Sequence, residues 1–379
     1  MSTASALRLD LAGLRTLPAQ VWGGVRLVPL VRDEPLPGLR LHQELYGDGV
    51  GVVRVAPHTA YVSYIPHGFV ADWGAGPAAS YGTLLHGAHG TPPPVDAVPV
   101  RFHRRMVRRT AKHRLRFLPL HLALEGYLSL HFGGPSIAWE EWSQQALRRG
   151  LSPRVEEAYC GAEVRGLADA LRVFEIHPGQ CGVLLYTADA LAAAFAVPHP
   201  DDYRALHATL VQDLYGELVH HYALLSAPVQ DFAPHLDAER IHSTADLREA
   251  LAEQRRQWAD FHTGTMAAGL LAPQYTARTA YRAGDFTLSR FLPAFVPRTE
   301  AHIGEAITAP DGRIAYLKTF RLSESQIRRG HLLTHLAAND WHLARTAAAL
   351  SLTPADLTAR LSSASLAPLL RHRPPQRAR

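Results

Sequence analysis

Lysine and cysteine are scarce in this sequence. Lys112 and Lys318 are the only lysines among 379 residues, and arginine carries the remaining positive charge. Arginine in place of lysine, with abundant alanine, leucine, glycine and proline, is typical of GC-rich bacteria, so the arginine count alone does not indicate nucleic-acid binding. The two cysteines, Cys160 and Cys181, form no CxxC pair, which excludes a thiolate metal cage.

Long hydrophobic runs are also missing. No stretch approaches the roughly 18 apolar residues that a membrane-spanning helix needs, and residues 1–17 carry Arg8, Asp10 and Arg15 where a signal peptide is apolar. We therefore expect a cytoplasmic protein without membrane contact. Hydrophobic residues make up 47% of the chain and charged residues 19%, which excludes a disordered chain and allows a large core.

The first hundred residues are predicted to be rich in strands. Runs of β-branched and aromatic residues at 21–31, 51–55 and 60–65 are bounded by glycine and proline. The glycine, alanine and proline of residues 72–94 predict a long surface loop. Residues 174–188 are expected to form two short buried strands around a Pro-Gly turn.

Helices are predicted at 120–131 and 136–149 in the middle of the chain. A long helix is expected to begin at Pro200, with a stripe of apolar side chains that ends at Leu225. The next helix follows Ser243, and its expected buried face is Leu247, Leu251, Trp258 and Phe261. A hairpin is expected around Pro310, Asp311 and Gly312. We expect an α+β fold, with a β-rich N-terminal part and a helical middle forming one body over residues 1–322.

The net charge of +5 is confined to the end of the chain. Residues 323–379 contain eight arginines and three acids, so residues 1–322 are neutral overall. Within this segment Ser323 with Gln326, and Thr353 with Pro354 and Asp356, are helix-start signals. We expect three short helices with a tight turn between the last two, over residues 323–371, and a basic disordered tail over 372–379.

The segment LARTAAALSLTPADLTARL resembles the Fis-type helix-turn-helix of bacterial regulators. It departs from that pattern at Trp341-His342, where Gly-Asn is usual, at Ser351, where glycine is usual, and at Pro354, where a basic residue is usual. The resemblance implies DNA as a partner. The candidate DNA-contacting residues are Thr353, Asp356, Thr358 and Arg360 on the third helix, with Arg328, Arg345, Arg371 and Arg373 as phosphate contacts. The alternative is a three-helix unit for dimerisation or docking, and a homodimer is a further possibility for the whole chain.

The segments at 21–39, 118–142 and 175–191 resemble the second-type domain associated with ADP-ribosylglycohydrolases and rhodanese-phosphatases. The activity of that family is undefined, and the association implies a place near ADP-ribose or NAD metabolism. The family supplies no catalytic residues to transfer. The sequence contains no GxSxG, HExxH or P-loop motif, and we expect no metal and no cofactor.

A few side chains in the body are candidates for chemistry. Glu140 lies between two tryptophans and, with Glu125 as a second carboxylate, has the residue type of a general acid or base. His177 flanks a Pro-Gly turn together with Gln180. The alternatives are exposed glutamates and a turn histidine bonded to the backbone. His199 with Asp201 and Asp202 is read as helix capping rather than a metal site, and His331 with His335 as a solvated face.

Residues 101–116 hold eight cations and no acid. We lean towards strands for this run, and it is either a solvated surface or an anion-binding face for nucleic acid or a phosphorylated ligand. The candidate anion-binding residues are Arg101, Arg104, Arg105, Arg108, Arg109 and Lys112. The leading hypothesis is a bacterial DNA-binding regulator or adaptor whose body senses a ligand linked to ADP-ribose or NAD. The alternative is an enzyme or binding module for a nucleotide-like substrate, with the helices used for assembly.

Overall fold

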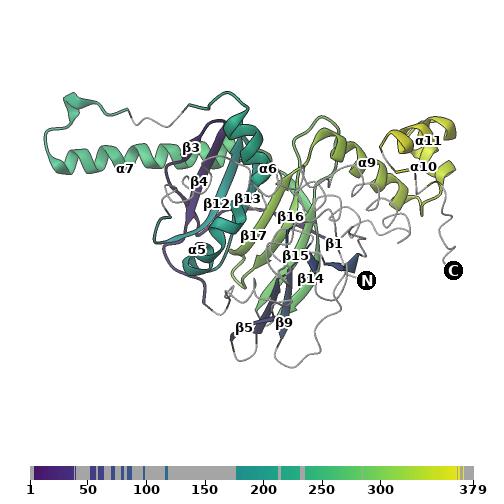
Figure 1. The fold of residues 1–379 in the computed structure, drawn as a ribbon, viewed down its shortest axis with the longest axis horizontal. Coiled ribbons are helices and arrows are strands. Elements are labelled where there is room, and N and C mark those ends of the chain that lie inside the picture. Colours follow the sequence, from purple (N-terminus) through teal and green to yellow (C-terminus); the bar gives the residue numbers. More distant parts are fainter. Residues whose placement is uncertain are drawn as a thin grey trace.

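The structure, a computed structural model, describes residues 4–37 and 39, seven short strands between residues 52 and 117, and residues 176–370 except 212–214, 231–234, 284, 365, 368 and 369. A large antiparallel sheet and several helices give the expected α+β fold (Figure 1). The predicted helices at 120–131 and 136–149, and most of the basic run at 101–116, lie outside the described residues.

The large sheet has ten strands in the order β1-β14-β15-β16-β17-β13-β12-β4-β2, with β3 also pairing with β4. Its strands are β1 Ala4–Arg8, β2 Arg15–Thr16, β3 Gln20–Trp22, β4 Val25–Val31, β12 Gln180–Thr187, β13 Ala190–Ala196, β14 Gln274–Ala283, β15 Phe286–Leu292, β16 His302–Thr308 and β17 Ile314–Arg321. The predicted hairpin around Pro310 is confirmed as the β16–β17 turn, where Gly312 has a φ of 83°.

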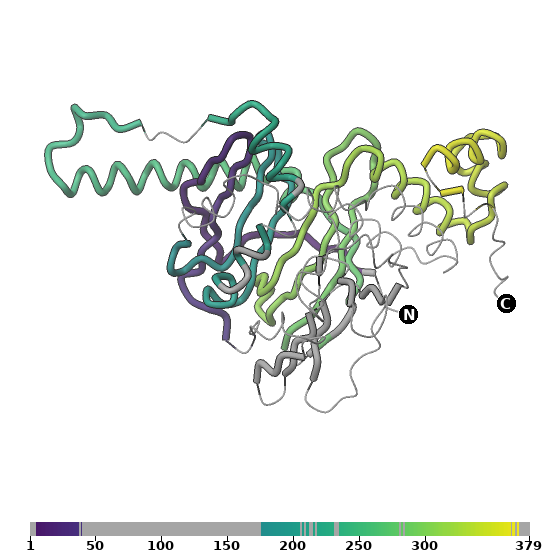
Figure 2. The backbone as a smooth tube through the Cα atoms, viewed as in Figure 1, coloured from purple at the N-terminus to yellow at the C-terminus, as the bar shows by residue number. Residues whose placement is uncertain are grey.

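The N-terminal segment supplies both edges of this sheet, because β1 pairs with β14 and β2 pairs with β4. Eight strand spacings of a flat sheet would separate β1 from β2 by about 38 Å, whereas the link of residues 9–14 reaches roughly 25 Å when fully extended. The sheet must therefore curl so that its edges approach each other. Figure 2 traces this segment in purple. Leu9 and Leu11 of the link are buried in one of the two core clusters, so that cluster fills the concave face.

The two faces of the sheet have different cores. The concave cluster contains many small side chains, including Ala194, Ala196 and Ala306, beside Leu317. The convex cluster joins large side chains of the sheet, such as Phe195 and Tyr316, to Tyr203 on a covering helix and to Leu333 and Leu361 near the C-terminus.

Seven short strands form two smaller sheets, β10-β8-β7-β11 and β5-β6-β9. They are β5 Val52–Ala56, β6 Thr59–Ser63, β7 Val70–Asp72, β8 Ala78–Ser80, β9 Thr83–Gly87, β10 Ala97–Val98 and β11 Arg116–Phe117. The predicted strands at 51–55 and 60–65 are confirmed as β5 and β6. The predicted long loop over 72–94 is wrong, because β8 and β9 lie within it and β9 pairs with β6. Strand pairing depends on distant partners, which local composition does not show.

The predicted long helix from Pro200 is divided. Its described parts are α5 Pro200–Thr209, α6 Gly216–Val219 and the π-helix η4 His220–Leu224. Leu210 is buried, but Leu225 at the end of the predicted stripe is 69% exposed. Residues 174–188 also differ from expectation, since Gln180–Thr187 forms a single eight-residue strand after a turn at 178–179.

Helix α7 (Thr244–Phe261) forms a projecting arm. Ser243 caps it as predicted, by accepting a hydrogen bond from the Asp246 backbone N–H at 3.2 Å. The expected buried face is wrong, because no residue of α7 is buried. Figure 1 shows the reason: the helix extends away from the sheet instead of covering it. The π-helix η6 His262–Met266 and α8 Ala268–Leu271 return the chain to the concave face, and η5 Ala238–Arg240 precedes the arm helix.

The C-terminal helices lie at the other end of the molecule (Figure 1). They are α9 Glu324–Ala338, α10 Leu343–Ala349 and α11 Pro354–Ser363. Helix α9 packs closely on the body, because a Cβ atom at Gly330 would lie 2.1 Å from the Phe295 ring. Leu333 of α9 and Leu361 of α11 belong to the same core cluster as Phe320 of the sheet. The helices are thus attached to the sheet through a continuous core.

The contact between Gly330 and Phe295 predicts the effect of a single methyl group. We expect Gly330→Ala to destabilise the protein by about 1–3 kcal/mol, because overpacking forces the Phe295 ring or the helix to shift. Gly264→Ala is the control, since nothing lies within 4 Å of its Cβ position. Urea unfolding compares the two, and equal stability of both variants would contradict the docking of α9.

Candidate functional site

The C-terminal helices begin where the sequence predicts. Ser323 and Gln326 form a capping box at the start of α9, and Thr353 and Asp356 form another at the start of α11, with Pro354 in the first turn. Each box satisfies helix N–H groups that have no partner within the helix. Helix α10 starts after His342, whose Nδ1 accepts from the Arg345 backbone N–H at 3.4 Å.

A tight turn joins α10 to α11. Ser351 has a φ of 54°, and the Leu352 N–H donates to the Ala347 carbonyl oxygen at 2.8 Å. This left-handed conformation is one that favours glycine, and here serine adopts it. Leu357 and Leu361 are the only buried residues of α11, so the rest of this helix faces away from its own core.

The candidate contact residues on α11 are all exposed, but several are already used locally. Thr353 and Asp356 share the capping box, and the Thr358 hydroxyl donates to the Pro354 carbonyl oxygen at 2.8 Å. The hydrogen bonds from Thr353 lower the pKa of Asp356, so this carboxylate keeps a negative charge at the start of the helix. Arg360 is exposed and forms no ion pair among the described residues.

The other arginines differ in availability. Arg328 is exposed and lies 3.9 Å from Glu324 on the preceding turn, and Arg345 is exposed on α10. Arg371 and Arg373 lie outside the described residues. Arg329 is unsuited to a phosphate contact, because its Nε donates to the Ala364 carbonyl oxygen at 2.9 Å and ties α9 to the end of α11. Burial of this guanidinium lowers its pKa.

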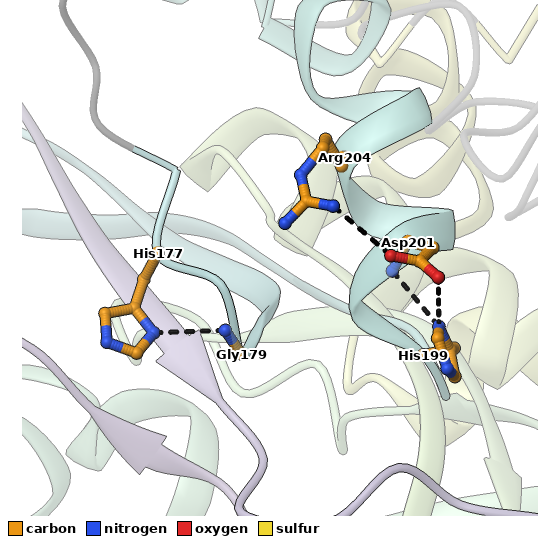
Figure 3. Close-up of polar contacts among 5 residues, drawn as sticks. All are labelled: His177, Gly179, His199, Asp201 and Arg204. Carbon is orange, nitrogen blue, oxygen red and sulfur yellow. Dashed lines mark hydrogen bonds and ion pairs between the residues drawn. The ribbon is translucent and has the colours of Figure 1, made fainter.

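The histidines singled out from the sequence have local structural roles (Figure 3). His177 is exposed, and its Nδ1 accepts from the Gly179 backbone N–H at 3.1 Å. His199 Nδ1 accepts from the Asp201 N–H at 3.1 Å, and Asp201 also pairs with Arg204. These contacts form two separate sets in the figure. They confirm a turn histidine and a helix cap.

His331 and His335 meet edge to face on α9, with ring centroids 4.6 Å apart. Both rings are half-buried, so the expectation of a solvated face is wrong, because the docking of α9 on the body covers this part of the helix. No group of three or more potential metal ligands occurs in the described residues. Glu125, Glu140 and the six candidate anion-binding residues of the basic run lie outside them.

A buried charge group in the sheet was missed from the sequence. Glu305 on β16 is directly opposite Arg290 on β15 and Lys318 on β17. Its carboxylate lies 3.1 Å from Arg290 Nε and 3.1 Å from Lys318 Nζ, and Glu305 and Lys318 are fully buried. Burial alone would raise the pKa of Glu305, but the two cations lower it. The available signal was a single lysine in an apolar strand of an otherwise arginine-rich chain.

The family model ARPP-2 matches residues 9–284, which is more than half of the sequence. The chain belongs to the ARPP-2 family. No curated protein and no solved structure matches it. The ARPP-2 segment ends near the turn between β14 and β15. Strands β15–β17 and the C-terminal helices follow this segment, and the three strands belong to the same ten-stranded sheet as the strands within it. No helix among the described residues is long and apolar enough to cross a membrane.

The ARPP-2 segment contains a second buried polar group, at the base of the arm. Arg26 and Tyr186 are cross-strand partners on β4 and β12, and the ring of His262 stacks on Tyr186 with centroids 5.7 Å apart. Arg26 donates to Asp189 at 2.9 Å and to the Gln230 carbonyl oxygen at 2.7 Å. Arg26 thus connects the sheet to the segment that leads into the arm, and His262 connects it to the segment that returns.

The neutral state of buried histidines predicts a pH dependence of stability. Burial lowers the pKa of His262 to about 4, with a contribution from Arg26, and lowers that of His207 to about 4. A histidine in the unfolded chain has a pKa of about 6.5. At a pH between about 6.5 and about 4, the unfolded chain therefore binds protons that the folded chain does not bind. The free energy of unfolding should therefore fall as the pH is lowered through this window, and the full stabilisation should be present above it.

His262→Phe should reduce the loss of stability that urea unfolding measures between pH 7.5 and pH 5, whereas His242→Phe, at an exposed position, should not. An unchanged pH slope in His262→Phe would refute this assignment.

The buried charge group predicts a non-additive response to mutation. Glu305→Gln leaves Lys318 buried beside a neutral amide, so we expect it to cost about 3–5 kcal/mol of stability. The double variant with Lys318→Met removes the buried ammonium and should recover part of that loss. If the double variant loses as much stability as the Glu305→Gln and Lys318→Met single variants together, the two side chains act independently, which would contradict this prediction.

Proposed function

We propose that this ARPP-2 protein is a DNA-binding regulator or adaptor that contacts DNA through α9–α11. The observation that carries this proposal is the exposure of α11. This helix buries only Leu357 and Leu361 and presents the rest of its surface after the tight turn at Ser351. An exposed second helix after such a turn is the element that helix-turn-helix proteins place in the major groove.

The distribution of charge supports the same surface. The excess of +5 comes from residues 323–379, and Arg328, Arg345 and Arg360 on the three helices are all exposed. The ionised Asp356 at the start of α11 repels phosphate, so binding depends on these arginines and on the basic tail. We therefore infer a mode dominated by phosphate contacts, with Arg360 as the candidate for a base contact.

The ARPP-2 body has the role of a ligand-responsive part in this proposal. We propose a nucleotide-like ligand related to ADP-ribose or NAD, as the resemblance of residues 21–39, 118–142 and 175–191 to the domain associated with ADP-ribosylglycohydrolases implies. The continuous core between the sheet and α9 supports this proposal, because it joins the sheet to the C-terminal helices by direct packing.

Replacement of the three arginines tests the DNA contact. The full chain should bind a random-sequence duplex with salt-dependent affinity. Replacing Arg328, Arg345 and Arg360 by alanine should lower the affinity and reduce the slope of log K against log salt by about two, one unit for each of the phosphate contacts of Arg328 and Arg345. Fluorescence anisotropy at several salt concentrations measures both quantities.

The matched control removes the same charge elsewhere. Arg240, Arg248 and Arg255 are exposed arginines on the arm, and their replacement by alanine should leave DNA affinity unchanged apart from a small effect of net charge. If the wild-type chain binds no DNA, or if the two triple variants lose affinity equally, the proposed surface is wrong.

A further inference from the structure

The arm helix α7 carries an unusual share of exposed apolar side chains. Five large hydrophobic residues are exposed in the described part of the chain, and four of them lie on α7 or at the start of the arm. They are Leu224, Leu225, Leu247 and Phe261. Figure 1 shows that α7 projects from the end of the molecule opposite to α10 and α11. This surface is therefore separate from the proposed DNA contact.

The length and isolation of α7 require a stabilising contact. The helix has 18 residues, none of them buried. Most of the stability of a protein helix comes from packing of its apolar face, because intrinsic propensity supports isolated helices of this length only marginally. A projecting helix without a buried residue is the expected form of an element that completes its packing on another molecule.

Four apolar residues of α7, with Gln254 between them, follow the spacing of a coiled-coil seam. Leu247, Leu251, Gln254, Trp258 and Phe261 are separated alternately by four and three residues, which places them along one line of the helix. Trp258 and Phe261 are stacked with ring centroids 5.6 Å apart at the base of the arm. We call these five positions the arm seam. A seam with this spacing accepts a second helix in knobs-into-holes packing.

The charges on α7 indicate which charge a second helix should carry beside the seam. Arg248 and Arg255 flank the arm seam on one side, at the heptad positions that contact a partner helix. Neither forms an ion pair within the described residues. The acids Glu249, Glu253 and Asp260 lie farther around the helix, about 120–160° from the centre line of the seam, whereas Arg248 and Arg255 lie about 80–100° from it on the other side. The edge of the seam is therefore basic, although the helix as a whole carries both charges.

We propose that the arm seam binds an acidic amphipathic helix of a partner protein. Such a helix supplies apolar residues at seven-residue spacing and carboxylates opposite Arg248 and Arg255. A second copy of α7 fits less well, because antiparallel pairing brings these arginines of the two copies together. A membrane surface also fits less well, because the polar face of α7 carries several acids, whereas membrane-surface helices are rich in lysine and arginine on that face.

Two designed peptides test the proposal on the full-length protein. Both are three-heptad helices with leucine at the seam positions. One carries glutamate at the flanking positions and the other carries lysine. We expect the acidic peptide to bind and the basic peptide to bind at least about tenfold more weakly, by isothermal titration calorimetry at low salt. Equal binding of both peptides, or binding of neither, would overturn the proposal.

Two variants locate the binding on α7. Replacing Arg248 and Arg255 by glutamate keeps the apolar seam and should reverse the preference between the peptides. Replacing Leu247 and Leu251 by glutamine should abolish binding of the acidic peptide, with helicity checked by circular dichroism. Arg240→Glu, on an exposed arginine outside α7, is the control and should leave the preference as it is.

Two further measurements separate the other occupants. Sedimentation velocity that shows a concentration-dependent dimer, lost in the Leu247 and Leu251 variant, would replace the partner helix by a second copy. Co-sedimentation with vesicles of phosphatidylcholine and phosphatidylserine, lost in the same variant, would replace it by a membrane. Either result contradicts the proposal. A protein that sediments as a monomer, does not co-sediment with vesicles and binds the acidic peptide supports it.

Discussion

The short link between β1 and β2 is the constraint on which the rest of the structure depends. It joins the two edges of the large sheet across a distance that a flat sheet could not span, so the sheet curls around Leu9 and Leu11. Ala194, Ala306 and Phe291 are buried on the inside of the curl, and Phe195 and Tyr316 are buried on the outside. The arm returns to the concave face through His262 and α8, and the C-terminal helices pack on the convex face.

This arrangement separates two surfaces. The arm seam projects at one end, and α10 and α11 lie at the other (Figure 1). Between them the sheet is cross-linked by the buried pair of Glu305 and Lys318 and is continuous with α9 through Phe295 and Gly330. A sheet with a packed core transmits displacement better than a flexible linker, because close-packed interiors are hard to compress. The two proposed contacts, with DNA and with a partner helix, are thus joined through the packed faces of one sheet.

Local signals predicted local structure well. The capping residues Ser323 and Thr353 and the turn at Gly312 depend on hydrogen bonds within a few residues, and the structure shows each of them. Features that depend on distant partners were not predictable. The strand β9 was hidden in a glycine-rich segment because it pairs with β6, and the arm was expected to be buried because its periodicity is that of a packed helix. Lys318 could be noticed as one of two lysines, but its partner Glu305 becomes visible only once the strand register is known.

The central claim is that DNA is contacted by the C-terminal helices and not by the ARPP-2 body. Hydrogen–deuterium exchange of the full chain, with and without a random-sequence duplex at low salt, measures the location of contact directly. The account predicts that DNA slows exchange in residues 323–379, most strongly in α11, and leaves α7 unchanged. Protection confined to the ARPP-2 segment, or no protection anywhere at a saturating DNA concentration, would contradict it.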